Sequence, residues 1–434
     1  MSTYKVVVVG AAGHVGLPLA LVLAEHGNHT VGIDIDEAAV SKINSGFIPF
    51  YEEGAEPLLR ECLASGTLRM TTNLAPVKYA DVVIIVLGTP IDNYLNPSLT
   101  GVVQLINDLC PLLRDGQQIV LRSTVSPGTT DRIKQIIEHK TGMTEGGDFD
   151  LIYAPERVLQ GKSLTEIKDL PHIIGAYSEE SFNRIGDFFS TFSHSTRHFL
   201  EPIEAELGKL MTNMARYVTF ALANEYHVIA DLYGANVNKI IDACNEDYPR
   251  LNLPSPGPNV GGPCLSKDGW FLVEKVPFND LIVTSYRINE GMPAQIVTKL
   301  AQAENIQSVA ILGMAFKAGN DDTRSSASFK LKKQLELDRY DVRCLDPHVN
   351  GYGDWSAIRG VDALVLMTPH KEFANLYRIA ELVENPGALV VDIWGFWSEM
   401  RYRSKNGYFS LREVTRDAGF GDGIGRVFDA VGDS

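Results

Sequence analysis

The chain lacks three features that would each define a class of protein. Its five cysteines include no CxxC pair and no paired framework, so we expect free thiols. No run of about twenty apolar residues occurs, so no membrane span is expected. Lysine and arginine number 39 against 54 aspartates and glutamates, a net charge of −15. Nucleic-acid binding is not expected, because phosphate contacts need a basic patch.

The N-terminus also lacks the marks of a secretory leader. MSTYKVVVVG enters an apolar strand at once, without a basic region, a long apolar run or a small-residue cleavage site. Together with the unpaired cysteines, this predicts a cytoplasmic protein. Of the 434 residues, 45% are hydrophobic, which is ample material for a core. A chain of this length is too long for one ordinary hydrophobic core. Two or three domains are therefore expected.

Apolar, β-branched strands alternate with helical patterns in the first part of the chain. The strand segments are 4–10, 30–36, 81–90, 117–130 and 150–158. Such alternation is typical of a doubly wound α/β sheet built from right-handed βαβ units. Most of these segments end in polar or glycine-rich residues, and functional groups in such sheets lie at the carboxyl ends of the strands.

The rest of the chain reads as a long helix and a second α/β pattern. Residues 201–235 keep helical apolar spacing over roughly nine turns, and 249–263 form a proline- and glycine-rich loop. Strand patterns resume at 308–316 and continue at 340–347, 362–369 and 388–394, and 421–434 is expected to hold a short strand. We predict two Rossmann-like doubly wound domains joined by a long central helix. The expected boundaries are 1–200 for cofactor binding, 201–300 for the helix and cysteine loop, and 301–434 for the second Rossmann-like domain.

A glycine-rich turn follows the first strand. Gly10, Gly13 and Gly16 lie between a strand and a helix, spaced one residue longer than the common G-x-G-x-x-G. Such glycines let a pyrophosphate approach the helix N-terminus. Asp34 ends the second strand, where a carboxylate accepts from ribose hydroxyls and repels a 2′-phosphate, so NAD is favoured over NADP. We include His14 and Val15 of the turn among the cofactor residues. A strand–helix turn without a ligand is the alternative.

Two further segments carry residues of chemical interest. GGPCLSKD places Cys264 in a glycine-rich loop beside Lys267 and Asp268, which favours a reactive thiol over a merely buried cysteine. Lys209 and Asn213 stand four apart on the long helix and therefore face the same way. Spacing alone favours a solvated lysine and an incidental amide for that pair.

Taken in order, the motifs resemble the UDP-glucose/GDP-mannose dehydrogenase family over nearly the whole chain. They are GHVGLPLA, GTP at 88–90, STVSPGTT at 123–130, APERV at 154–158, AELGKLMTN at 205–213, GGPCLSKD at 261–268 and AFKAGNDDTRSS at 315–326. The resemblance implies a homodimer formed through the central helix. It also implies that C6 of a nucleotide sugar is oxidised twice, with two NAD per sugar and no release of the aldehyde.

The resemblance also assigns roles to residues of this chain. Cys264 matches the nucleophile, Lys209 and Asn213 the residues that hold the oxyanion, and Asp268 the acid that works with a water. Glu156 and Thr124 match a carboxylate and a hydroxyl near C6. The further positions implied for NAD are Thr89, Thr124, Lys267 and Arg324, and those for substrate are Glu156, Arg157, Lys209, Asn213, Arg250, Gly261, Arg287, Phe316 and Lys317. Arg250 would reach substrate across the dimer, and no metal is expected.

The substrate signals conflict. PERV at 155–158 and YRINEGMP at 286–293 resemble the branch that acts on UDP-N-acetylhexosamines, whereas Lys267 is closer to the UDP-glucose pattern. We favour a UDP-N-acetylhexosamine, with UDP-glucose second and GDP-mannose third. Two other classes stay open, a single-hydride NAD-dependent hydroxyacid dehydrogenase and a non-catalytic nucleotide-binding regulator. Neither of them needs GGPCLSKD.

Overall fold

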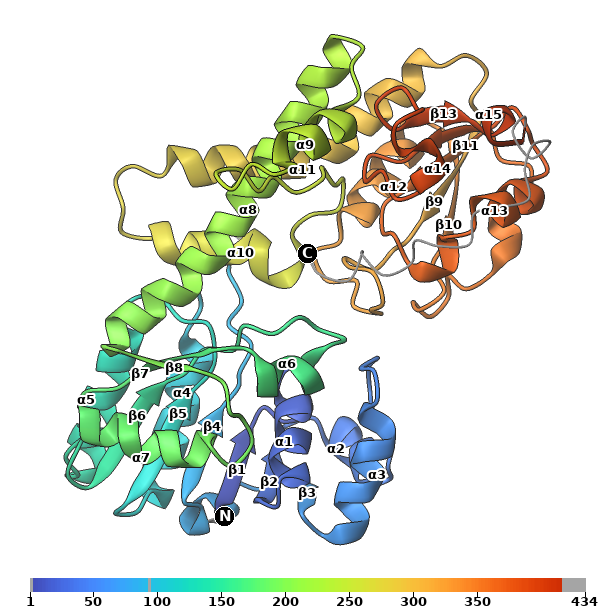
Figure 1. Ribbon diagram of the computed structural model, residues 1–434. Coiled ribbons are helices and arrows are strands. Elements are labelled where there is room, and N and C mark those ends of the chain that lie inside the picture. Colours follow the sequence, from blue (N-terminus) through green and yellow to red (C-terminus); the bar gives the residue numbers. More distant parts are fainter. Residues whose placement is uncertain (1–2, 93–94, 416–434) are drawn as a thin grey trace. The chain divides into compact units, whose positions relative to one another are not determined.

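Figure 1 shows the computed structural model of the chain, in which residues 3–92 and 95–415 are described. The residues form two compact units, Met1–Asn213 with Lys267–Phe278 and Met214–Ser266 with Asn279–Ser434. The domain boundaries expected at residues 200 and 300 remain a prediction. The strand expected at 421–434 lies outside the described residues. In the part of the chain described, no helix is both long and apolar enough to cross a bilayer.

The first unit is built on an eight-stranded sheet. Its order is β3-β2-β1-β4-β5-β6-β7-β8, and the ladders are parallel except for the antiparallel pair β6–β7. The first six strands follow the order of a doubly wound, dinucleotide-binding sheet. The strands are β1 (Lys5–Val9), β2 (His29–Ile33), β3 (Leu68–Thr71), β4 (Val82–Ile85), β5 (Gln117–Leu121), β6 (Phe149–Tyr153), β7 (His172–Gly175) and β8 (Arg197–Leu200).

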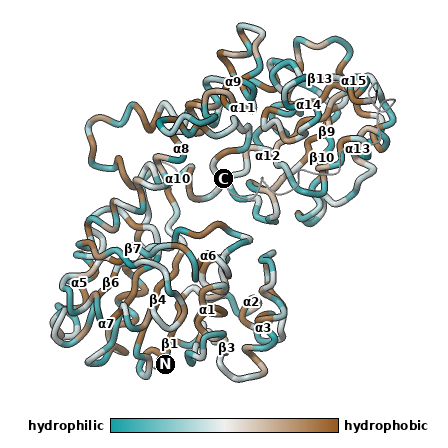
Figure 2. The backbone as a smooth tube through the Cα atoms, viewed as in Figure 1, coloured by the Kyte–Doolittle hydropathy of each residue, from teal (hydrophilic) through white to brown (hydrophobic). Residues whose placement is uncertain are grey.

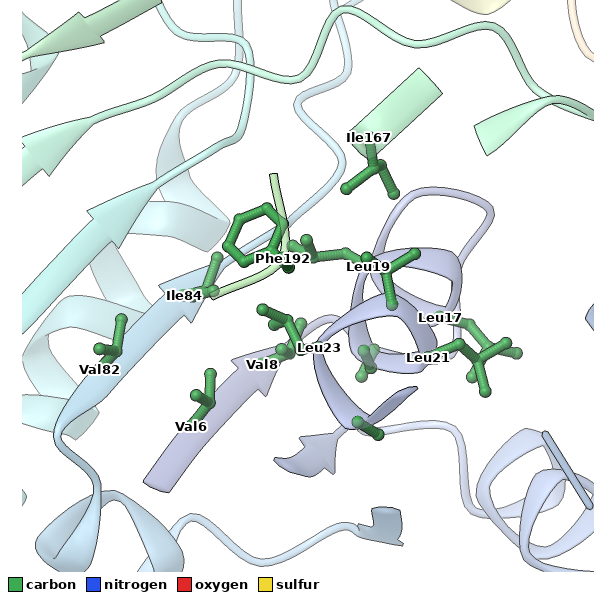
Figure 3. Close-up of a cluster of buried hydrophobic side chains, with 14 of the residues drawn as sticks. Val6, Val8, Leu17, Leu19, Leu21, Leu23, Val82, Ile84, Ile167 and Phe192 are labelled. Atoms are coloured by element: carbon green, nitrogen blue, oxygen red, sulfur yellow. The ribbon is translucent and has the colours of Figure 1, made fainter. Parts of the chain in front are cut away.

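Helices cover this sheet on both faces, and β1 shows why its apolar run is continuous. Val6 and Val8 belong to the core cluster that holds α1, while Val7 and Val9 belong to the cluster on the opposite face. Figure 3 shows Val6 and Val8 beside Leu19, Leu23 and Phe192. The helices are α1 (Gly16–Glu25), α2 (Glu37–Asn44), α3 (Ala55–Ser65), α4 (Thr100–Leu109), α5 (Thr129–Thr141), α6 (Ser163–Asp169) and α7 (Glu179–Phe189), with short 3₁₀ turns η1 (Ala75–Tyr79) and η2 (Cys110–Leu112).

The second unit repeats the architecture on a smaller scale, with a five-stranded sheet in the order β10-β9-β11-β12-β13. Only its last pair, β12–β13, is antiparallel. In both sheets the central strands are hydrophobic (Figure 2). The elements are α9 (Val237–Asn245), α11 (Asp280–Gln302), β9 (Ser308–Leu312), α12 (Ala327–Leu337), β10 (Asp341–Leu345), η3 (Trp355–Ile358), β11 (Ala363–Leu366), η4 (Lys371–Phe373), α13 (Leu376–Val383), β12 (Leu389–Val391), α14 (Ser398–Arg401), β13 (Tyr408–Ser410) and α15 (Leu411–Thr415).

Two helices contribute residues to both units. The long helix predicted at 201–235 is α8 (Pro202–Leu232), with 31 residues. The second is α10 (Gly262–Val273), which corrects the sequence analysis, because Cys264 lies in the first turn of a helix and not in a loop. Pro263 is compatible with this position, since the first N–H groups of a helix need no intrahelical partner.

The predicted fold class is confirmed: two doubly wound α/β units and a long central helix are present. Four strands were not anticipated, namely β3, β7, β8 and β13. Each has only three or four residues; LRMT alternates apolar with polar side chains, and RHFL begins with two polar ones. None of the four is the continuous apolar run that marks a central parallel strand, whereas β4, which is equally short, is VVII.

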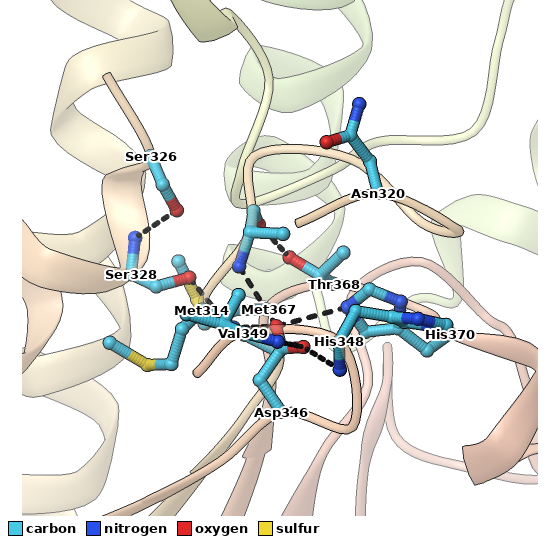
Figure 4. Close-up of polar contacts among 12 residues, drawn as sticks. Met314, Asn320, Ser326, Ser328, Asp346, His348, Val349, Met367, Thr368 and His370 are labelled. Carbon is cyan, nitrogen blue, oxygen red and sulfur yellow. Dashed lines mark hydrogen bonds and ion pairs between the residues drawn. The ribbon is translucent and has the colours of Figure 1, made fainter. Parts of the chain in front are cut away.

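In the second unit, the turn after β9 is held by one carboxylate. Asp346, which directly follows β10, accepts from the N–H groups of Met314 at 2.6 Å and Ala315 at 2.9 Å. It also accepts from the N–H of His348 and contacts Nε2 of His370 (Figure 4). Burial would raise the pKa of Asp346, but His370 and the N–H groups outweigh it and lower the pKa to about 2.

We expect Asp346→Asn to lower the free energy of unfolding by about 2–3 kcal/mol at pH 7. Because the folded pKa is depressed, this stabilisation is present above the unfolded pKa and is lost as pH falls. The difference between wild type and variant should therefore shrink to about half near pH 3 in urea unfolding curves. The control, Asp341→Asn, removes an exposed carboxylate at the start of β10. A difference independent of pH would contradict the assignment.

Candidate active site

The three glycines of the first turn are present for different structural reasons. Gly10 has a φ of +87°, and a Cβ there would lie 2.1 Å from the carbonyl oxygen of Val86. A Cβ on Gly16 would lie 2.1 Å from the carbonyl oxygen of Gly10, so both glycines are required by packing. At Gly13 the nearest atom is 3.8 Å away. The protein itself does not fill the space over Gly13, as expected where a ligand approaches the backbone.

The neighbourhood of this turn fits a dinucleotide. Val15 at the N-cap of α1 makes no side-chain capping bond, so the positive end of the helix is not taken by a capping side chain. The Asp34 carboxylate accepts from the N–H of Ala12 at 2.9 Å and closes the turn. His14 stacks on Phe50 with ring centroids 4.2 Å apart. Ile35, which the sequence analysis did not single out, exposes an apolar surface next to Asp34 that suits an adenine ring.

The ends of β4 and β5 are tied together at two hydroxyl groups. Thr89 is buried, and its hydroxyl donates to the carbonyl oxygen of Thr124 at 2.6 Å. The N–H of Leu87 donates to Oγ of Ser123 at 2.8 Å. The segments GTP and STVSPG, predicted to contribute to one site, therefore lie side by side. Thr124 itself is partly exposed, whereas Thr89 positions it.

Glu156, just beyond β6, has partners at each of its oxygen atoms. One carboxylate oxygen pairs with the guanidinium of Arg122, the other accepts from the N–H of Arg157 at 2.9 Å, and the carbonyl oxygen accepts from Nζ of Lys209 at 2.7 Å. Burial would raise the pKa of Glu156, but the charge and hydrogen bond of Arg122 outweigh burial and lower it. Glu156 is therefore a buried carboxylate kept ionised. The guanidinium of Arg157 donates to the carbonyl of Pro171.

Lys209 and Asn213, on one face of α8, bond to different partners, and Lys209 donates to the Glu156 carbonyl. The amide of Asn213 donates to Asp268 at 2.6 Å, and the other oxygen of Asp268 pairs with Lys267 at 2.9 Å. Asp268 is fully buried. Lysine has three donors and an asparagine amide has two, so each keeps at least one donor for a substrate oxygen. The expectation of a solvated lysine and an incidental amide is wrong, because both side chains are buried.

Cys264 lies four residues before Asp268 on α10, and its thiol is exposed and not in a disulfide. In the second unit, Gly262 has a φ of +59°, and a Cβ there would lie 2.3 Å from the ring of Phe316. The start of α10 therefore packs against Phe316, the neighbour of Lys317. Gly261, with a φ of +146°, has no such close neighbour.

The structure also places the predicted arginines. Arg324 binds Asp322 through Nε and Nη2, which raises its pKa, and the nearby Cys264 thiol adds to the rise. Arg250 is exposed and lies over the ring of Tyr248. Arg287 is exposed on α11, and its side chain makes no hydrogen bond or ion pair with another described residue.

The sequence analysis did not single out three buried polar residues, two in the first unit and one in the second. They are Arg122, Glu206 and Asn289. Glu206 accepts from the N–H groups of Gly128 and Thr130 at the start of α5. Asn289 accepts from the amide of Asn224 and donates to the carbonyl of Tyr217. The signal was the position of Glu206 inside AELGKLMTN and of Arg122 directly before STVSPGTT, since a buried charge needs a partner.

One group of side chains in the second unit has the composition of a metal site. The ligand atoms of His348, His370 and Glu372 lie within 4.8 Å of one another. However, Nε2 of His370 bonds to Asp346, and its Nδ1 accepts from the N–H of Gly319. Both ring nitrogens of His370 thus have protein partners, so we assign no metal to this group.

These features define a class of protein: an NAD-dependent dehydrogenase with two Rossmann-like units, the first of which carries the dinucleotide turn. The comparison with known families gives the particular family. Residues 4–193 match the NAD binding domain of the UDP-glucose/GDP-mannose dehydrogenase family, 203–290 its central domain and 310–399 its UDP binding domain. The chain belongs to this family, and it is a nucleotide-sugar dehydrogenase that uses NAD.

Three relatives illustrate the similarity. The UDP-N-acetyl-D-mannosamine dehydrogenase of Pyrococcus horikoshii is 35% identical over 382 residues, which are 86% of this chain and 91% of the relative. The NDP-N-acetyl-D-galactosaminuronic acid dehydrogenase of Ralstonia nicotianae is 30% identical, over 92% of this chain and 97% of the relative. The solved UDP-N-acetyl-mannosamine dehydrogenase of Staphylococcus aureus is similar with a TM-score of 0.78 and 33% identity, over 86% and 90% of the two chains.

Proposed function

We propose that this enzyme oxidises the C6 hydroxymethyl group of a UDP-N-acetylhexosamine to a carboxylate, in two oxidations through a covalent intermediate on Cys264. The observation that carries the proposal is the buried group of Lys209, Asn213 and Asp268, with Cys264 one helical turn before Asp268 on α10. The names of the relatives in Pyrococcus and Staphylococcus make UDP-N-acetylmannosamine the first substrate to test. UDP-glucose is the alternative.

The chemistry explains why a thiol is needed. Bound NAD supplies the hydride acceptor in each of two oxidations. The first converts the alcohol to an aldehyde, and the Cys264 sulfur then adds to the aldehyde carbon to form a thiohemiacetal. Loss of the second hydride gives a thioester, which water hydrolyses to the carboxylic acid and the free thiol. The balance is one sugar alcohol, two NAD+ and one water, giving one sugar acid, two NADH and two protons.

The remaining residues stabilise charge and move protons in this scheme. Lys209 and Asn213 donate to the negative oxygen of each tetrahedral species, an effect of about 3–4 kcal/mol per donor in oxyanion holes. Asp268, held between Lys267 and Asn213, takes part in proton transfer with a water. Glu156 and Thr124 flank C6 and the hydrolytic water. For the nucleotide sugar, Phe316, Lys317, Gly261 and Arg287 are the proposed contacts.

A panel of UDP- and GDP-sugars tests substrate and reaction class together. We expect NADH formation with UDP-N-acetylmannosamine, UDP-N-acetylglucosamine or UDP-N-acetylgalactosamine, at two NADH per sugar acid, measured by absorbance and mass spectrometry. Each oxidation removes one hydride, so a yield of one NADH would indicate a single-hydride dehydrogenase. Activity with UDP-glucose alone would show that Lys267 was the better guide to the sugar.

Cys264→Ala should abolish steady turnover, because the aldehyde cannot be oxidised further without a nucleophile. At most one reversible oxidation should remain, visible as less than one NADH per active site in a single-turnover experiment. Cys244 offers a matched control, since its thiol is also exposed but lies on α9. Cys244→Ala should keep full activity. A folded Cys264→Ala variant with turnover near that of wild type would rule out the covalent intermediate.

We also propose a homodimer that involves α8. Leu222, Tyr226, Ile229 and Tyr233 are exposed at spacings of four, three and four residues, so they form an apolar stripe on one face of α8 and the turn after it. A long exposed stripe of this kind marks an association surface, and a two-fold axis lets the same stripe pack against itself. In such a dimer, Arg250 would contact the nucleotide sugar bound by the other subunit.

Ile229→Glu should produce a monomer, because two carboxylates would face an apolar interface without partners. Light scattering coupled to size-exclusion chromatography measures the mass directly. Leu337→Glu is the control, since Leu337 is at least as exposed but lies on α12 away from the stripe. A wild-type monomer with full activity would contradict both the dimer and the role of Arg250.

A further inference from the structure

A buried ion pair lies at the carboxyl ends of β5 and β6 in the first unit. Arg122 follows β5 directly, and 2% of its side chain is exposed. Its guanidinium pairs with the Glu156 carboxylate, of which 11% is exposed. Its Nε has no hydrogen-bond partner within the described residues. Burying a charge in this way is costly, and pairs of this kind often add little stability, which points to a functional reason for the pair.

We propose that Arg122 is a positioning residue of this enzyme. Its guanidinium holds the Glu156 carboxylate and, through the backbone of Glu156, the Lys209 ammonium, without touching substrate. The link to Lys209 is the 2.7 Å hydrogen bond from its Nζ to the Glu156 carbonyl. The inference rests on the proposed function, since it assumes that Glu156 and Lys209 act at C6.

The groups around Glu156 leave Arg122 as its one close cationic partner in the described part of the chain. Arg157 donates only its backbone N–H to the carboxylate, since its guanidinium bonds to the carbonyl of Pro171. Lys209 bonds to the carbonyl and not to the carboxylate. The charge state of Glu156 therefore depends on Arg122.

The remaining titratable neighbour, His172 on β7, is neutral. Oγ of Ser193 donates its proton to the carbonyl of Lys168 at 2.6 Å, so it accepts from Nε2–H of His172 at 3.0 Å. Burial, and next the charge of Arg122, lower the pKa of His172 to about 4. His172 supplies no charge to the pair at neutral pH.

The consequence is a defined acid limit for catalysis. With Arg122 present, Glu156 stays ionised down to a pH below the usual range of a glutamate, because its pKa is lowered. Without Arg122, burial acts alone and raises the pKa of the carboxyl group. Glu156 would then be protonated at a higher pH, and it could neither accept from the hydrolytic water nor keep its present orientation.

The test is the pH profile of kcat/KM for Arg122→Gln and Arg122→Lys. We expect the acid limb of Arg122→Gln to move up by at least about one pH unit, with Arg122→Lys between it and wild type. The lysine variant keeps the charge and serves if the glutamine variant does not fold. Arg184→Gln is the control, because Arg184 forms an ion pair with Asp150 near the start of β6, the strand that Glu156 follows. It should leave the acid limb in place.

A second measurement does not depend on activity. The carboxyl carbon of Glu156, labelled with ¹³C and assigned by comparison with Glu156→Gln, should titrate below the ordinary range of glutamate in wild type and above it in Arg122→Gln. An unshifted acid limb in both Arg122 variants, or a Glu156 carboxyl that titrates normally in wild type, would overturn the inference. If wild type oxidises no nucleotide sugar, the proposed function fails, and the carboxyl titration still decides whether Arg122 controls Glu156.

Discussion

The fold depends on one backbone constraint that occurs in both units. After β1 in the first unit and after β9 in the second, the chain turns so close to the end of a neighbouring strand that the residue in the turn cannot carry a Cβ. Gly10 and Gly313 both adopt a φ near +90°, and a Cβ on either would lie within 2.3 Å of a neighbouring strand's end. Each glycine N–H bonds to the last residue of the second strand. Asp34 and Asp346 then accept from the N–H groups that follow.

This constraint explains why one turn suits a ligand and the other is closed by protein. Asp34 accepts from one turn N–H and one N–H of its own loop, and it remains partly exposed. Asp346 is fully buried, with His370 and several N–H groups around it. The same arrangement therefore leaves a partly exposed carboxylate in the first unit, at the proposed ribose-binding position, and gives a structural anchor in the second.

Sequence patterns predicted the parts of the fold that depend on continuous apolar runs or on glycine. The central strands, α8 and the Asp34 turn belong to this group. The patterns failed where tertiary contacts decide. One example is β3, which lies at the edge of the sheet and pairs only with β2. Another is α10, which begins at Gly262 despite the prolines before it, because Gly262 packs against Phe316. Spacing alone also placed Lys209 and Asn213 in solvent, since their partners Glu156 and Asp268 are more than fifty residues away along the chain.

The division of the first unit along the chain has a consequence for biosynthesis. All eight strands of its sheet precede residue 201, yet the unit also needs Lys267–Phe278. Asn213 bonds to Asp268, 55 residues later. A nascent chain that has emerged from the ribosome as far as α8 can form the sheet and the dinucleotide turn. Asn213, however, lacks its hydrogen-bond partner Asp268 until α10 has emerged. The dinucleotide turn is therefore complete earlier in translation than the group proposed to surround the reacting carbon.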